Sequence, residues 1–190
     1  RVKIGDPRSL PLNIATNLQK AVGVNRPKEG PMISLWEPRL PDVYSQIFGE
    51  FSKAVNTQQI PRFVLSFAGD WGPLLLSSDT SEESGWPDLW AGDPIAQQSF
   101  RDFLIRRYGK IELLRSAWRD NIASWNAIIP SISPDNHPNR NLDVLSWYRD
   151  SMTGLVRQIA SVARRYFPQT RIVLEIADDF GYSATDPMEL

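Results

Sequence analysis

"RFVLSFAGD", residues 62–70, is the stretch that decides the fold class. Its apolar run is nearly continuous, which is typical of a strand buried on both faces of a parallel sheet. The run ends abruptly on Asp70, which is followed by Trp71 and flanked by Gly69 and Gly72. This stretch therefore predicts an internal parallel strand that finishes on a carboxylate beside an indole.

Segments with helical periodicity lie on both sides of this strand. Apolar residues recur at helical spacing in three segments, which predicts helices over 41–55, 94–108 and 142–166, and a shorter helix carries Ile111, Leu114 and Trp118. Asp93 followed by Pro94 is a strong helix start, because aspartate caps the first turn and proline fits the first helical position. Further short strands are predicted at 1–6, 32–36 and 171–179.

Strands that alternate with helices predict an α/β fold with parallel strands, either an open sheet or a (β/α)8 barrel. The nucleotide-binding glycine motifs of such folds are absent from the sequence. A complete barrel needs ~250 residues, whereas this chain has 190 residues and about four predicted strands. If the fold is a barrel, we expect residues 1–190 to form one incomplete domain that covers roughly strands 3 to 5.

Composition excludes several classes of function. The net charge of −1 gives no electrostatic reason to expect a nucleic-acid partner, and no apolar run is long enough for a membrane span. With no cysteine and His137 as the single histidine, the sequence predicts no metal site, no Ser-His-Asp triad and no cofactor. The absence of cysteine also leaves the cellular compartment undecided.

Residues 93–118 resemble a segment of glycoside hydrolase family 42 and its relatives, the helical stretch that follows the fourth barrel strand. The residues that fit the family pattern are Phe100, Arg101, Phe103, Leu104, Arg107, Tyr108, Gly109, Ile111, Leu114, Ala117 and Trp118. Residues 34–44 and the predicted helix over 142–166 lie in the expected places before and after it. The resemblance implies a portion of a (β/α)8 (TIM) barrel with outer helices, and retaining β-galactosidase activity.

The resemblance allows two alignments of the fourth strand. In family 42 that strand ends in Asn-Glu, where the glutamate is the general acid/base, and this alignment puts Asp70 at the catalytic position. The β-amylase-like barrels end the same strand in Gly-x-x-Gly-Glu, and this alignment puts Pro73 in place of the glutamate. In the first alignment, an aspartate replaces the longer glutamate as general acid. In the second alignment, no ionisable side chain occupies that position. The family's nucleophile is a glutamate on the seventh strand, which we expect beyond Leu190.

Several residues near the predicted strand ends are candidates for binding sugar. Indole faces stack on the C–H faces of sugars, so we expect Trp71, Trp86 and Trp90 to be possible platforms. Asp178 and Asp179 lie at the end of the strand predicted at 171–179 and are candidates for binding hydroxyls. The alternative for each aspartate, Asp70 included, is a turn or capping role through its own backbone.

Two main functions follow from these expectations. The first is a glycoside hydrolase that acts on β-galactosides or related glycans with Asp70 as its acid. The second is a catalytically impaired barrel of the same descent that binds carbohydrate without cleaving it. An unrelated open sheet that binds a small ligand is a third possibility. In both barrel cases the partner is a carbohydrate, and the rest of the barrel or another chain completes the fold.

Overall fold

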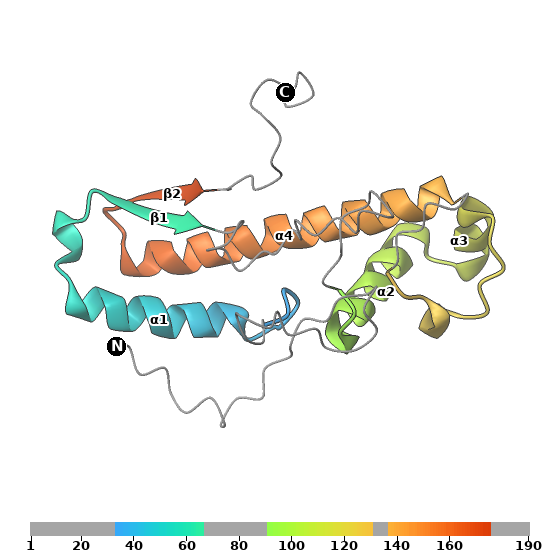
Figure 1. Cartoon of the computed structure of the whole chain (residues 1–190), viewed down its shortest axis with the longest axis horizontal. Helices are drawn as coiled ribbons and strands as arrows, with labels where there is room; N and C mark the ends of the chain where they lie inside the picture. The colour runs from blue at the N-terminus through green and yellow to red at the C-terminus, as the bar shows by residue number, and fades with distance from the viewer. Residues whose placement is uncertain (1–32, 67–90, 131–136, 176–190) are drawn as a thin grey trace, which may run out of the picture.

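A computed structural model describes residues 33–66, 91–130 and 137–175 of the chain. Two parallel strands lie at one end of a long helix, and a group of shorter helices lies at the other end (Figure 1). The elements in chain order are α1 (Leu40–Ala54), η2 (Thr57–Gln59), β1 (Arg62–Ser66), α2 (Pro94–Tyr108), α3 (Ile111–Trp118), η3 (Trp125–Ala127), α4 (Pro138–Tyr166) and β2 (Arg171–Glu175).

The strands β1 and β2 are hydrogen-bonded neighbours although they are far apart in the sequence. They run parallel, with Arg62 opposite Arg171 and Ser66 opposite Glu175. Parallel strands need a crossover connection, usually one that contains helices. Here the chain between them includes α2, α3 and α4, so the predicted α/β class with parallel strands is confirmed.

Helices α1 and α4 cover one face of this strand pair. Phe63 of β1 packs edge-on against Phe48 of α1, with ring centroids 5.6 Å apart, and stacks on Phe167 after α4 at 4.7 Å. Leu65 and Ile172 belong to the same cluster, which we call the strand-side core. Val64 points to the opposite face and is 55% exposed. Helices on one face and an open apolar face on the other are what a sector of a barrel requires.

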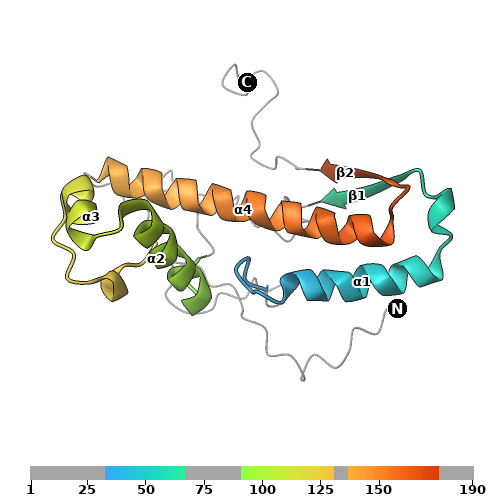
Figure 2. The same ribbon diagram turned by 180° about the vertical axis from the view of Figure 1, so that it is seen from behind.

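A second cluster, the helical core, holds α2 and α3 against the first half of α4. Its fully buried side chains include Phe100 and Leu104 of α2, Leu114 of α3 and Val144 of α4. The view from behind shows the same arrangement, with α4 extending from the strands to α3 (Figure 2). At a rise of ~1.5 Å per residue, the 29 residues of α4 link the two cores along a single rigid axis.

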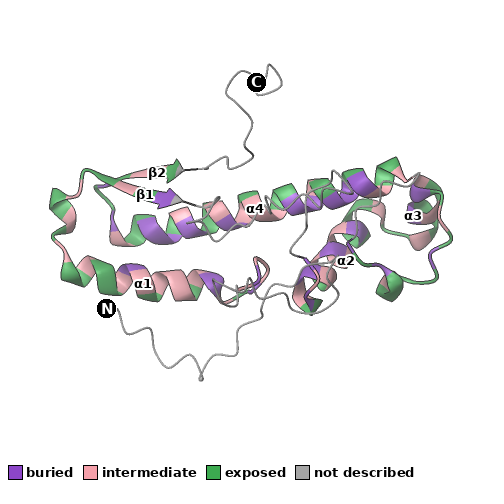
Figure 3. Ribbon diagram, viewed as in Figure 1, coloured by how far each residue is buried: buried purple, intermediate pink, exposed green. Residues whose placement is uncertain are grey.

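Most helix predictions are confirmed, with two corrections to α4. Pro138 is the first residue of α4, four residues before the predicted start, because a proline at this position loses no helical hydrogen bond. Helical spacing from Tyr148 and Met152 predicts that Leu145 is buried, but it is 37% exposed, whereas Val144 and Trp147 are buried. Buried positions recur along α4 on the side that meets the other helices (Figure 3).

Two further expectations are wrong in the described ranges. Residues 33–36 do not form a strand: Ile33 makes a single β-bridge and the chain then turns, with the Glu37 amide donating to the Ser34 carbonyl at 3.1 Å. Helix α2 does not cover the strands either. It packs on α3 and α4 away from the sheet, because its apolar side chains are buried in the helical core (Figure 1).

Candidate functional site

The carboxyl ends of β1 and β2 lie side by side. The register ends with Ser66 opposite Glu175, and residues 67–90 and 176–190 follow directly after these two ends. All six predicted site residues occur in these two segments, which are outside the described residues: Asp70, Trp71, Trp86, Trp90, Asp178 and Asp179. Their spatial arrangement therefore remains a prediction, although the two segments start from one sheet edge.

A short turn, residues 33–39, leads into α1 on the side toward which β1 and β2 point (Figure 1). The turn is held by an ion pair in which Arg39 Nε donates to Glu37 Oε1 at 2.7 Å and Arg39 Nη2 donates to Glu37 Oε2 at 3.1 Å. The Glu37 side chain is fully buried. Its hydrogen bond raises the pKa of the Arg39 guanidinium, which favours the charged form of that side chain.

Asp93 joins this turn to α2. Its Oδ1 accepts the Ala96 amide at 3.0 Å and so caps the helix, as the sequence predicted. Its Oδ2 accepts the Ser34 hydroxyl at 3.0 Å, a contact across 59 residues that the sequence did not predict. Burial raises the pKa of the Asp93 carboxyl, and the hydrogen bonds from Ala96 and Ser34 oppose that rise. Asp93 is therefore a buried anchor between two segments.

Trp36 packs inward. Its ring stacks on Trp147 of α4, with centroids 4.6 Å apart and planes 11° from parallel. Its Nε1 donates to the Ser151 hydroxyl at 3.0 Å. Both the face and the polar edge of this indole are thus used within the protein, so Trp36 joins the turn to the helical core.

Asp143 of α4 is the centre of a buried polar network. Its Oδ2 accepts hydrogen bonds from the Tyr108 hydroxyl and from Trp118 Nε1, both at 2.7 Å. Arg107 Nε lies 3.2 Å from its Oδ1. Burial and the bond to Asp143 raise the pKa of the Tyr108 hydroxyl to about 12. The network joins α2, α3 and α4 through one carboxylate.

Sequence reasoning missed this network, although a signal was present. Asp143 directly precedes Val144 and lies one helical turn before Trp147, so it falls within a buried apolar stripe. A carboxylate in such a place needs hydrogen-bonded or charged partners. Tyr108 and Trp118, each with one polar atom on a large apolar ring, are suitable partners.

The described carboxylates with the most buried surroundings are therefore all engaged in holding segments together. Glu37, Asp93 and Asp143 each have hydrogen-bond partners inside the protein. Within residues 33–66, 91–130 and 137–175, no three His, Asp or Glu side chains gather in a way that could hold a metal ion. In the same ranges, no helix combines the length and apolar character needed to cross a bilayer.

Comparisons with known proteins point to one group. No protein-family model matches the chain. A thermophilic β-amylase of Thermoanaerobacterium thermosulfurigenes is 26% identical over an alignment of 148 residues, and the match covers 71% of this chain and 26% of that protein. The structure resembles the catalytic domain of a β-amylase from Paenibacillus polymyxa with a TM-score of 0.59 and 22% identity, over 76% of this chain and 38% of the other.

These likenesses establish the fold class at a coarse level. The chain has an α/β architecture with parallel strands, like part of a β-amylase catalytic domain, which is a (β/α)8 barrel. The chain spans about a quarter of the length of the curated relative that it matches. The comparisons support a glycosidase-like fold and give no specific support to family 42 or to β-galactosidase activity.

Proposed function

We propose that this chain is one sector of a (β/α)8 carbohydrate-active protein, with its glycan site at the carboxyl ends of β1 and β2. The observation that carries the proposal is the parallel pairing of these strands, with Ser66 opposite Glu175. In (β/α)8 enzymes, catalytic residues come from the loops that follow the carboxyl ends of the strands. Similarity to a β-amylase in both sequence and fold supports the glycosidase class.

Asp70 is the proposed general acid. It follows β1 by four residues in the sequence, beside Trp71. A carboxyl group next to an apolar ring has its neutral form favoured, which is what a proton donor needs. In hydrolysis, the Asp70 proton would pass to the leaving glycosidic oxygen as the bond to the anomeric carbon breaks. A second carboxylate would attack that carbon or activate water, at ~5–5.5 Å from the acid in a retaining enzyme and ~6.5–9.5 Å in an inverting one.

The other proposed site residues would bind the sugar. Trp71, Trp86 and Trp90 would stack on C–H faces of the rings, and Asp178 and Asp179 would accept hydrogen bonds from hydroxyl groups. The two aspartates follow β2 and the tryptophans follow β1 in the sequence. Because these strands pair in parallel, the chain segments that carry the two sets of residues begin at the same end of the sheet, which supports the proposal.

A binding-only barrel is the second candidate, and one observation favours it. The comparisons name β-amylases, and in the β-amylase-like alignment of residues 69–73, Pro73 stands where those proteins have the catalytic glutamate. Proline has no ionisable side chain and cannot donate a proton. In that alignment the site would keep the tryptophans and aspartates that bind sugar. It would lack the general acid that donates a proton to the glycosidic oxygen.

The two resemblances also imply two different classes of substrate. The resemblance to family 42 implies β-galactosides, whereas an amylase by its name acts on starch. Both are glycans with hydroxyl groups and apolar ring faces, so the same binding residues serve either. We therefore propose a glycan substrate and distinguish the two classes by assay.

The test compares wild type with Asp70→Asn in the full protein, using lactose, starch and nitrophenyl glycosides as substrates. Loss of a general acid costs ~10²–10⁴ in rate on natural glycosides. The loss should be much smaller on nitrophenyl glycosides, because their leaving group needs little protonation. Asp79→Asn is the matched control and should retain full rate. An unchanged rate for Asp70→Asn on the natural substrate would remove Asp70 from the mechanism, and sugar binding without hydrolysis by wild type would favour the binding-only barrel.

A further inference from the structure

The amino ends of β1 and β2 carry two arginines side by side. Arg62 begins β1 and Arg171 begins β2, and the two residues are partners in the parallel register. The Arg171 amide donates to the Pro61 carbonyl at 3.2 Å, so the two chains are already adjacent where the strands begin. Both arginines are exposed. They lie at the end of the strands that is opposite to the proposed glycan site (Figure 1).

The two arginines belong to the same face of the strand pair. Successive residues of a strand point to opposite faces, and Phe63 and Ile172 both pack in the strand-side core. Arg62 and Arg171 are therefore on the opposite, open face, together with Val64. Neighbouring strands are ~4.8 Å apart, which is close enough for two guanidinium groups to contact one small ligand.

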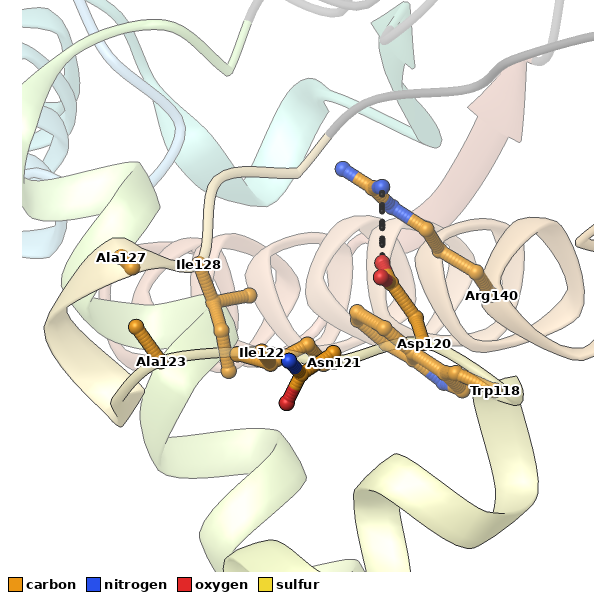
Figure 4. Close-up of a pocket in the computed structure, with 8 residues that line it drawn as sticks. All are labelled: Trp118, Asp120, Asn121, Ile122, Ala123, Ala127, Ile128 and Arg140. Atoms are coloured by element: carbon orange, nitrogen blue, oxygen red, sulfur yellow. Dashed lines mark ion pairs between the residues drawn. The ribbon is translucent and has the colours of Figure 1, made fainter.

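Several arginines elsewhere in the molecule pair with carboxylates, unlike these two. At the helical end, Arg140 forms an ion pair with Asp120, with Nη1 3.9 Å from Oδ2 (Figure 4). Within the described part of the chain, no ion pair includes Arg62 or Arg171. Like charges that lie directly opposite one another destabilise a sheet. An anion bound between the two arginines would relieve that repulsion.

The segments that lead into the two strands add positive charge and no negative charge. Residues 56–62 and 164–171 contain four arginines and no aspartate or glutamate. One of these arginines, Arg164, is held at this end of the sheet, because its Nη1 donates to the Thr170 carbonyl at 2.8 Å. An anion that approaches the amino ends of the strands is therefore attracted by several cations, and these segments offer no carboxylate to compete with it.

We propose that Arg62 and Arg171 form a binding site for a phosphate group, carried either by free phosphate or by a small ester such as a sugar phosphate. A guanidinium presents its N–H groups as a planar fork that matches two oxygens of an anion. One fork satisfies a carboxylate, whereas a phosphate has further oxygens for a second fork. Two neighbouring arginines therefore favour phosphate over a carboxylate. The site does not depend on the proposed function, because no residue of the proposed glycan site takes part in it.

The test is isothermal titration calorimetry of the full protein at constant ionic strength, with inorganic phosphate, glucose 6-phosphate and acetate as probes. We expect phosphate to bind and acetate not to bind. Arg62→Gln and Arg171→Gln should each weaken phosphate binding roughly tenfold or more, because each removes a charged donor. Arg62→Lys keeps the charge but loses the fork, so it should still bind more weakly than wild type. Arg106→Gln is the matched control, because Arg106 is an exposed arginine of α2, and it should bind like wild type.

The double variant Arg62→Gln/Arg171→Gln separates the possible outcomes. If it loses the binding seen in wild type, the order of the two phosphate probes identifies the source of the phosphate. Tighter binding of glucose 6-phosphate would indicate a sugar phosphate, and tighter binding of inorganic phosphate would indicate the free ion. Absence of phosphate binding by wild type would overturn the proposal. Unchanged binding in the double variant, or equal binding of acetate, would overturn it as well.

Discussion

At the scale of single residues, Asp143 joins three helices through its side chain. One buried carboxylate accepts bonds from Tyr108 and Trp118 and pairs with Arg107. Asp143→Asn keeps the shape but removes the charge, so the bonds become neutral and weaker. We expect the free energy of unfolding to fall by about 1–3 kcal/mol, measured by urea denaturation. Asp150→Asn, on the exposed face of the same helix, should change it by less than about 0.5 kcal/mol. Equal effects of the two changes would contradict the role of Asp143.

The Tyr108 hydroxyl makes the stability of the same network depend on pH in the alkaline range. Its pKa is about 12 in the folded protein, against an ordinary value of 10.0. A raised pKa means that the folded state holds the proton more tightly than the unfolded state. Its contribution is therefore complete below pH 10 and is lost as pH rises through 12.

The prediction for Tyr108 compares wild type with Tyr108→Phe. The stability of the variant should fall less steeply between pH 10 and pH 12, because the variant has no hydroxyl to titrate there. Urea denaturation at several pH values measures the two slopes. Tyr166→Phe, which removes a tyrosine hydroxyl outside this network, is the control. Parallel stability curves for wild type and Tyr108→Phe would refute the assignment.

Substitutions at two residues with positive φ should change the stability of the protein in opposite directions. Gly109 ends α2 with φ of 72°, and Arg119 ends α3 with φ of 52°. A Cβ at Gly109 would meet no atom within 4 Å, so Gly109→Ala tests the backbone alone and should cost about 1 kcal/mol. Arg119 is a non-glycine residue in the left-handed region, so Arg119→Gly should stabilise the protein by about 0.5 kcal/mol. Thermal denaturation shows both, and a stabilising Gly109→Ala would be inconsistent with the observed dihedral angle.

At the scale of elements, Asp93 determines where α2 begins and what it is attached to. The carboxyl group caps the helix and accepts the Ser34 hydroxyl, but burial raises its pKa and so disfavours its charge. Asp93→Ala loses both contacts and should lower the free energy of unfolding by about 1–2 kcal/mol. Asp93→Asn can keep both contacts without a charge.

The stability of Asp93→Asn relative to wild type should increase with pH. Because the folded pKa is raised, ionisation of Asp93 lowers stability as pH rises through that pKa. At neutral pH the asparagine variant should therefore be at least as stable as wild type, and its advantage should shrink in acid. Denaturation at acidic and neutral pH measures this. A large loss in Asp93→Asn at neutral pH would show that the charge itself is required.

At the scale of the whole molecule, the open face of β1 gives a test of the barrel proposal. Val64 is 55% exposed opposite the strand-side core. If residues 1–190 are one sector of a barrel, this face needs further strands to cover it, and apolar sheet surface without cover promotes association. The isolated 190-residue chain should therefore self-associate, and Val64→Ser should reduce this in analytical ultracentrifugation.

The control for this test is the corresponding serine substitution on the covered face. Leu65 is buried against α1 and α4 in the strand-side core. Leu65→Ser should lower stability and should not improve solubility. A monodisperse monomer of the unmodified 190-residue chain would contradict the incomplete-barrel proposal.

The sequence by itself determined the features that depend on near neighbours. The helix over 94–108 was predicted to the residue, because Asp93, Pro94 and Gly109 are end signals that act within one turn. The apolar stripe of Phe100 and Leu104 follows from helical period alone. The parallel α/β class also followed from the order of elements. The six candidate site residues are predictions from the same local reasoning and from the family resemblance.

Only the tertiary structure decided the features that depend on residues far apart in the chain. The pairing of β1 with β2, the turn at 33–36 and the outward position of Leu145 depend on which surfaces meet, and no local pattern encodes that. Asp143 and Asp93 became buried anchors because partners from other segments satisfy their oxygens. The physical reason is that a polar group can be buried only where its hydrogen bonds are met, and those partners are brought together by folding.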